Sequence, residues 1–283
     1  MKKLLLCLIF SLNTFAIDFS ECQIEAQEYG GINKINDECF DSILSMSSTQ
    51  NRVSKKEGNI FAVAHENIIV LKSNINLKLK IEKEDAASFK PYLYKIAGNK
   101  TTINKISSVA LSSQLTKIAV LNESSDGEKE ILIFSSYRSG NFSPLKIIKL
   151  KGLAKKPVKI EFDSDGLYIL DGNQGRIIVV SSLSDSRNPD KSKKPKLLKE
   201  IELNGLSNLD VVSFSLSDEY LLLGDRSSAQ IIFVDKSCSG QCEFLDKFTD
   251  HILESCNLEN VNLVNQEITL TNTCGQRSVR HLN

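Results

Sequence analysis

Tryptophan is absent from this 283-residue sequence, histidine occurs only three times, and the charges cancel, with 35 Lys and Arg against 35 Asp and Glu. Without an excess of basic residues, the chain lacks the electrostatic footprint of a nucleic-acid-binding protein. His65, His251 and His281 do not have the spacing of zinc ligands on a helix, and neither a Gly-x-Ser-x-Gly elbow nor a glycine-rich phosphate loop is present. No common hydrolase or nucleotide-binding motif marks the chain.

Long apolar runs are also missing, apart from one near the N-terminus. Residues 4–12 are almost all apolar, follow Lys2 and Lys3, and are followed by the small residue Ala16, which is the pattern of a secretory signal peptide. The run is shorter than the roughly 18 apolar residues that span a bilayer, so we expect cleavage rather than an anchor. The sequence predicts a signal peptide over residues 1–16, a mature chain from Ile17 without a transmembrane segment, and a secreted or periplasmic protein.

If the protein is exported, its cysteines are expected to form disulfides. An even number of them outside the signal peptide indicates disulfides in an oxidising compartment, although several connectivities are possible. A zinc site would need C-x-x-C pairs or nearby histidines, and the cysteines do not have that spacing. Pairing of neighbours closes the shortest loops and is our hypothesis: Cys22–Cys39, Cys238–Cys242 and Cys256–Cys274. We expect no metal ion and no other cofactor.

Residues 17–57 differ in their pattern of polar and apolar residues from the rest of the chain. Ser20 is a candidate cap for a helix over residues 22–28, which carries Glu in its first turns and is followed by two glycines. Residues 39–44 place apolar side chains at helical spacing and predict a second helix. The polar residues 51–58 are interpreted as a linker. The expected organisation is therefore an N-terminal helical segment with a linker, followed by a second domain over residues 58–283.

From residue 58 onward, short apolar runs recur in five units. The units open about fifty residues apart, within the range of propeller blades; the openings are at Ile60, Val109, Ile160, Val212 and Val261. Two further apolar runs follow in each unit, and four of the units add a fourth run that is more polar and alternating. Residues 159–182 show the pattern most clearly, because turns rich in Asp, Asn and Gly separate their three runs.

The order of these runs predicts an all-β fold, a β-propeller of five blades. Inner strands of a propeller are covered on both faces by neighbouring blades, whereas the outermost strand meets solvent. A sandwich would show alternation in most strands instead. The fifth unit ends after its third run, so either residues 51–56 supply a closing outer strand or the last blade has three strands. In both cases we expect the N-terminal helices beside blade five, where they would cover an exposed edge.

Three turns of the repeats contain a related short motif, in which a hydrophobic residue and polar residues precede an apolar strand. The three motifs are Val109-Ala110-Leu111-Ser112-Ser113, Phe162-Asp163-Ser164-Asp165-Gly166 and Phe214-Ser215-Leu216-Ser217-Asp218. Residues 58–283 thereby resemble the WD-like and Tol-associated families of bacterial β-propellers. The repeat proline and the Gly-His and Trp-Asp signatures of those families are absent. The resemblance implies the propeller fold and no particular activity.

Links from the second to the third strand of each blade should open on one face of the ring, near the central channel. The polar residues expected there are Asn122, Asp171, Asn173, Asp225, Arg226 and Asn272. Convergent amides, carboxylates and a guanidinium can bind a peptide, a sugar or a cation. Asp and Asn are also ordinary turn residues. These six are the candidate ligand-binding residues, and no catalytic residue is predicted.

The favoured hypothesis is a monomeric, non-catalytic binding platform that contacts a protein or a component of the cell envelope, and no nucleic acid. A second hypothesis is an exported metal-dependent hydrolase or lactonase-like enzyme, with its site at the channel mouth. A third is a purely structural envelope protein. The fold does not decide among them, because propellers serve many functions.

Overall fold

The structure is a computed structural model of the chain. It describes the strands between residues 25 and 94, and then residues 103–112, 116–135, 144–164, 166–172, 175–181, 195–203, 210–226, 229–250, 256–264 and 266–282. The predicted signal peptide, the predicted helix over residues 39–44, the Cys22–Cys39 pair and Asn173 lie outside the described residues.

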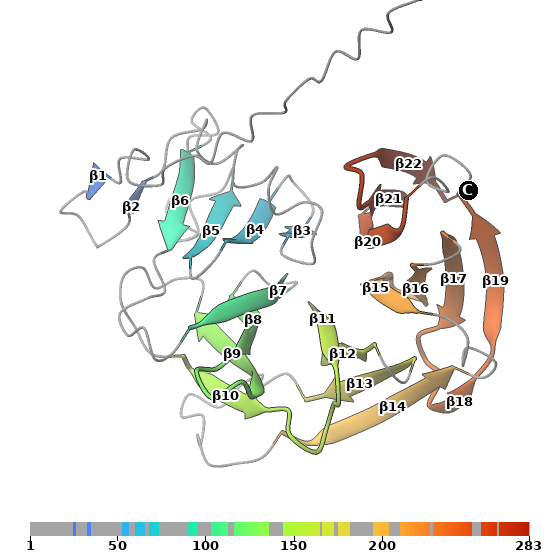
Figure 1. The fold of residues 1–283 in the computed structure, drawn as a ribbon, viewed down its shortest axis with the longest axis horizontal. Helices are drawn as coiled ribbons and strands as arrows, with labels where there is room; N and C mark the ends of the chain where they lie inside the picture. Colours follow the sequence, from blue (N-terminus) through green and yellow to red (C-terminus); the bar gives the residue numbers. More distant parts are fainter. Residues whose placement is uncertain are drawn as a thin grey trace, which may run out of the picture.

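Five sheets surround a common centre (Figure 1). The first contains β3 (Val53–Lys56), β4 (Ile60–His65), β5 (Ile68–Ser73) and β6 (Lys90–Tyr94), with β2 (Asn33–Lys34) and β1 (Glu25–Ala26) beyond β6. The second contains β7 (Lys105–Leu111), β8 (Lys117–Glu123), β9 (Lys129–Ser135) and β10 (Lys146–Lys149). The third contains β11 (Pro157–Phe162), β12 (Leu167–Asp171), β13 (Arg176–Val180) and β14 (Leu197–Leu203), with β18 (Gly240–Cys242) at its edge. The fourth contains β15 (Val211–Leu216), β16 (Tyr220–Asp225), β17 (Gln230–Asp235) and β19 (Phe244–Thr249), and the fifth β20 (Leu258–Val264), β21 (Glu267–Asn272) and β22 (Arg277–His281).

The propeller fold is confirmed, but the prediction of five blades is wrong in its number. The first four sheets each contain a meander of four antiparallel strands, and we call them blades 1 to 4. The fifth sheet has three strands in the described part of the chain. The innermost strands β3, β7, β11, β15 and β20 contact one another in turn, and β20 also contacts β3. The ring therefore closes through four complete blades and one three-stranded sheet.

Blade 1 begins one strand earlier than the sequence suggested. Residues 53–56 were assigned to a linker or to a closing strand of the last blade, yet they form β3 and pair with β4, with Val53 opposite Val63. The run that starts at Ile60 is thus a second strand. The sequence Val-Ser-Lys-Lys of β3 has too few apolar residues to predict an inner strand by itself. Its position follows from its contacts with β7 and β20.

The helix predicted over residues 22–28 is not confirmed. Glu25 and Ala26 form β1, which pairs with β2, and β2 continues the pairing to β6 of blade 1. No helix occurs in the part of the chain that the structure describes. A cap and a few favourable residues do not stabilise so short a helix, and hydrogen bonding to an existing sheet edge competes with it.

Apolar side chains form the core between neighbouring blades. One cluster joins Leu170 and Ile177 of blade 3 to Phe214 and Leu221 of blade 4, and similar clusters lie at the other three contacts. Every residue of β12 is buried, whereas the outer strand β14 has one buried residue in seven. The predicted gradient from buried inner strands to a solvated outer strand is confirmed, because stacked blades cover the inner strands on both faces.

Serine hydroxyls connect the innermost strands of successive sheets. Ser108 Oγ of β7 accepts the backbone N–H of Ile160 at 3.1 Å. Ser213 Oγ of β15 accepts the N–H of Val261 at 3.0 Å, and Ser215 Oγ accepts that of Leu263 at 2.9 Å. Strands of different sheets do not share a hydrogen-bond ladder here, so these side chains satisfy buried backbone donors that would otherwise lack a partner.

Lys159 occupies the position in β11 that Ser108 and Ser213 hold in their strands. Its ammonium donates to Ser213 Oγ at 3.0 Å, to Asn260 Oδ1 at 3.1 Å and to the Val261 carbonyl at 2.8 Å. It also lies 3.4 Å from a carboxylate oxygen of Glu161. This buried lysine therefore connects blade 3 to both blade 4 and the fifth sheet.

Two of the three predicted disulfides are confirmed. Cys256–Cys274 joins the segment before β20 to the turn after β21, and Cys238–Cys242 closes the connection between β17 and β19. Within that connection β18 crosses to blade 3 and pairs in parallel with β14. As for membrane spans, the described residues contain no helix long and apolar enough to cross a bilayer.

Candidate functional site

Four of the residues predicted at the channel mouth occupy equivalent positions in the fold. Asn122, Asp171, Asp225 and Asn272 lie at the ends of β8, β12, β16 and β21, and their side chains are buried. Arg226 follows β16 and is about half exposed. The structure thus places the four residues at equivalent strand ends, with their side chains beneath the surface.

Two buried carboxylates of this set accept backbone hydrogen bonds from the segments that enter the inner strands. Asp171 accepts the N–H groups of Lys155 and Lys156 at 2.9 and 2.8 Å. Asp225 Oδ1 accepts the N–H of Asp210 at 2.8 Å. Each carboxylate therefore fixes the backbone of a residue that precedes β11 or β15.

The two amides also accept backbone hydrogen bonds, Asn122 from an entering segment and Asn272 from its own turn. Asn122 Oδ1 accepts the N–H of Asn104, just before β7, at 3.0 Å. Asn272 Oδ1 accepts the N–H of Gln276 at 2.9 Å within its own turn. These bonds give the four buried residues a positioning role. Their binding of a ligand stays a prediction.

An open pocket of about 200 Å³, here called the mouth pocket, lies where four inner strands begin. Its lining includes Ser107, Val158, Val212 and Glu259. Each of these is the extra residue of a β-bulge at the same place in β7, β11, β15 and β20. A bulge re-aims a side chain out of the regular alternation of a strand. Four equivalent bulges therefore bring residues of four sheets to one pocket.

Charged groups complete the lining of the mouth pocket. Lys156, Asp210 and Arg226 lie around it, and Arg226 Nε is 3.0 Å from Asp210 Oδ2. Burial raises the pKa of Glu259, and the positive charge of Arg226 opposes part of this effect. The pocket thus combines a partly desolvated carboxyl with an ammonium and an ion pair.

Sequence reasoning found Arg226 in this pocket but missed Lys156, Asp210 and Glu259. The missed residues lie at or just before the first residues of inner strands, whereas the prediction considered only the links after second strands. Aligning the starts of the repeats would have brought Val158, Val212 and Glu259 to one position. The bulge that turns these side chains toward the pocket has no sequence signal of its own here, because none of the four bulge residues is glycine.

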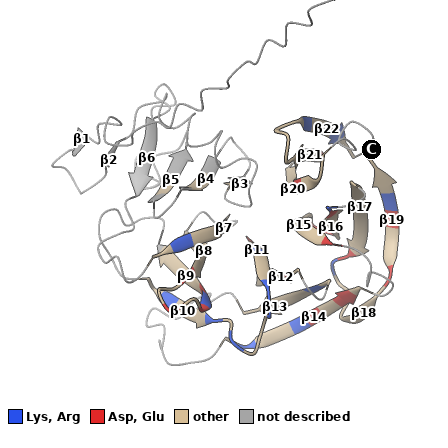
Figure 2. Cartoon of the chain, viewed as in Figure 1, with Lys and Arg blue, Asp and Glu red and all other residues tan. Residues whose placement is uncertain are grey.

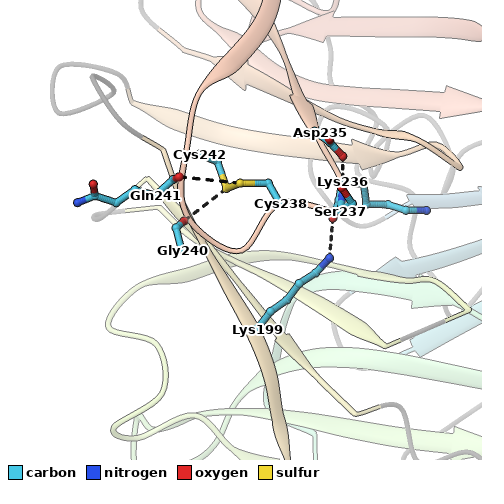
Figure 3. Close-up of a disulfide and its surroundings, with 8 residues drawn as sticks. All are labelled: Lys199, Asp235, Lys236, Ser237, Cys238, Gly240, Gln241 and Cys242. Carbon is cyan, nitrogen blue, oxygen red and sulfur yellow. Dashed lines mark hydrogen bonds between the residues drawn. A yellow bond between two sulfur atoms is a disulfide. The ribbon is translucent and has the colours of Figure 1, made fainter.

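A second pocket, of about 660 Å³ and here called the outer pocket, lies on the opposite face, since antiparallel strands alternate in direction. It is lined by Lys199, Asp218, Glu219, Tyr220, Asp235, Lys236, Ser237 and Leu245. Figure 3 shows the neighbouring Cys238–Cys242 disulfide. The Lys199 ammonium donates to the Lys236 carbonyl at 2.5 Å and so ties β14 to the connection after β17 (Figure 3). The pocket wall is therefore fixed by contacts between blades 3 and 4.

The two lysines of the outer pocket make hydrogen bonds and an ion pair within the protein. Besides the bond from Lys199, the Lys236 ammonium contacts Asp163 Oδ2 at 2.5 Å and the Ser217 carbonyl at 2.6 Å. Asp218, Glu219 and Asp235 are exposed. Hydrogen bonds from Ser237 lower the pKa of Asp235, which keeps this carboxylate ionised. The exposed charge at the outer pocket is therefore negative.

Large apolar side chains border the same pocket. Leu245 is 58% exposed and Tyr220 is 36% exposed. Phe244 and Leu198, which precede Leu245 and Lys199 in their strands, are exposed as well, but the lining of the pocket contains only Tyr220 and Leu245 of these four. Basic and acidic residues are interspersed along the outer strands β14 and β19, whereas β10 carries two lysines (Figure 2). The outer pocket differs from this mixed surface in combining exposed hydrophobic groups with carboxylates.

Within the described ranges, no group of three or more His, Cys, Asp and Glu side chains has a geometry that would hold a metal ion. The cysteines of the two disulfides are joined to one another.

No protein-family model matches the sequence, and no curated protein matches it. Among solved structures, the chain is similar to one in the nidogen/laminin complex. The two are 12% identical, the match covers 81% of this chain and 79% of that chain, and the TM-score is 0.48. It is also similar to the glutaminyl cyclase of Myxococcus xanthus, at 10% identity over 83% of this chain and 93% of that chain, with a TM-score of 0.47. A third is the WD40 β-propeller domain of Doa1, at 10% identity over 82% and 65% of the two chains, with a TM-score of 0.46. The Tol-associated family is not confirmed.

Proposed function

We propose that this protein is an exported, monomeric and non-catalytic platform that binds a protein partner of the cell envelope at the outer pocket. The observation that supports this proposal is the exposure of Leu245 and Tyr220, which line a pocket of about 660 Å³. Contiguous exposed apolar groups bordered by polar residues are typical of interaction sites. Tyrosine and phenylalanine are also enriched in the centres of protein interfaces.

The charges of the outer pocket indicate the chemistry of the partner. Asp218, Glu219 and Asp235 supply exposed carboxylates, whereas the lysines are held in contacts within the protein. A partner that presents basic side chains beside a large apolar one matches this surface in both charge and polarity. The two disulfides support export, because such bonds persist in oxidising compartments.

A random-peptide display library panned against the immobilised protein tests the proposal. We expect enrichment of peptides that combine Arg or Lys with an aromatic or aliphatic residue. Leu245→Glu should weaken binding of these peptides by about 2 kcal/mol or more, as for a central interface residue. Ile147→Glu on β10 is the matched control, because Ile147 is 45% exposed but lies on blade 2. Equal binding to both variants would contradict the assignment of the site.

A further inference from the structure

The mouth pocket has a chemistry that the outer pocket lacks. Its bulge residues Val158 and Val212, together with Val211, present an apolar wall. The charged residues lie around that wall and come from three different segments: Lys156 before β11, Asp210 and Arg226 beside β15 and β16, and Glu259 in β20. The pocket therefore offers a ligand both hydrocarbon contact and charges of two signs.

Two of these charges neutralise one another. Asp210 and Arg226 form an ion pair at 3.0 Å. Within the described part of the chain, no ion pair at 4.0 Å or less involves the Lys156 ammonium or the Glu259 carboxylate. A ligand with one positive and one negative group would complement these two residues, and one with a net charge would leave one of them without a counterion.

Backbone hydrogen bonds hold the positions from which these charges project. Lys156 is fixed through its N–H by Asp171, and Asp210 through its N–H by Asp225. Glu259 projects from the bulge of β20. A backbone that is already held in place lowers the entropy that the protein loses when it binds a ligand. Burial raises the pKa of the Glu259 carboxyl, and a bound cation would stabilise its ionised form.

The size of the pocket limits the ligand. Its volume of about 200 Å³ is below the range of about 300–1,000 Å³ typical for drug-sized ligands. We propose that the mouth pocket binds a small aliphatic zwitterion, namely an α-amino acid with a branched hydrocarbon side chain. The ligand ammonium pairs with Glu259 and its carboxylate pairs with Lys156. The hydrocarbon side chain contacts the valine wall. This site is independent of protein binding at the outer pocket.

Isothermal titration calorimetry of the mature chain with L-valine tests the proposal directly. Isobutylamine lacks the carboxylate of valine, and isovalerate lacks its ammonium. We expect saturable binding of L-valine, and affinities at least about tenfold lower for both analogues, because each loses a charge-assisted hydrogen bond. Failure of L-valine to bind, or equal affinity for isobutylamine or isovalerate, would overturn the proposal. These measurements need no variant.

Matched variants locate the binding. Glu259→Gln and Lys156→Gln should each lower the affinity for L-valine about tenfold or more. Lys155→Gln is the control for the lysine, because Lys155 is the exposed neighbour of Lys156 and does not line the pocket. Glu202→Gln on the outer strand β14 is the control for the glutamate. Binding that survives both pocket substitutions unchanged would place the ligand elsewhere and refute the assignment.

Discussion

Lys159→Met removes the buried charge that connects three sheets while keeping a side chain of similar length. The lysine side chain is 4% exposed, and its ammonium makes three hydrogen bonds of 2.8 to 3.1 Å to residues of β15 and β20. Methionine cannot donate to these acceptors. It also leaves the Glu161 carboxylate, which lies 3.4 Å from the ammonium, without its counterion.

Removing one partner of a buried ion pair costs about 3–5 kcal/mol, because the other charge stays buried and uncompensated. Glu161 is 14% exposed and still accepts the N–H of Leu216 at 3.0 Å, so some of its solvation is retained. We therefore expect the free energy of unfolding to fall by about 3 kcal/mol, at the lower end of that range. For a chain of this size, the melting temperature should fall by about 6–12 °C.

Urea denaturation of the oxidised protein, followed by far-ultraviolet circular dichroism, measures this change. Lys155→Met is the control, because Lys155 is exposed and contributes its backbone N–H, which the substitution keeps. The urea dependence should stay the same, since the surface exposed on unfolding does not change. A loss below about 1 kcal/mol, within the range of an exposed ion pair, would refute the reasoning that Lys159 holds the sheets together.

Two further perturbations test the packing of the fifth sheet and the mouth pocket. Gly224→Ala would place a Cβ atom 2.6 Å from Val261 Cγ2 and 2.7 Å from Leu258 Cδ2, so overpacking should cost about 1–3 kcal/mol by urea denaturation. Val261→Ala should recover part of that loss in a double-mutant cycle, and purely additive costs would count against the clash. Burial raises the pKa of Glu259 above the ordinary glutamate pKa of about 4.3. Above that pH the folded state therefore binds more protons than the unfolded state. The free energy of unfolding should fall as the pH rises through the raised pKa. Glu259→Gln should lessen the fall of the urea midpoint as the pH rises above about 4.3, and an unchanged pH profile would contradict the assigned burial effect.

Much of the propeller could be predicted from the sequence because its signals are local. A continuous apolar run such as residues 167–170, followed by a turn of Asp, Gly and Asn, specifies a buried strand and a sharp reversal within a few residues. The prediction that a more polar fourth run follows the apolar runs is likewise met by the outer strands β14 and β19. The two confirmed disulfides join cysteines that are 4 and 18 residues apart, which is why the choice of short loops succeeded.

Other features depend on segments that meet only in the folded ring. Lys159 bonds to residues 54, 101 and 102 positions away, and its sequence context indicates merely a lysine within a strand. Asp171 and Asp225 end their strands, and their hydrogen bonds to backbone N–H groups could not be inferred from turn composition. The outer pocket combines Lys199, Tyr220 and Leu245 from two blades.

The sequence by itself determined the four-stranded meanders of blades 2 to 4 and the two local disulfides, because apolar patterning and turn residues act over a few positions. Tertiary structure alone decided that β3 is the inner strand of blade 1, that the fifth sheet has three strands in its described part, and that four bulges meet at one pocket. These outcomes depend on packing between sheets, where a strand is buried and a side chain is re-aimed by neighbours about fifty residues away or more.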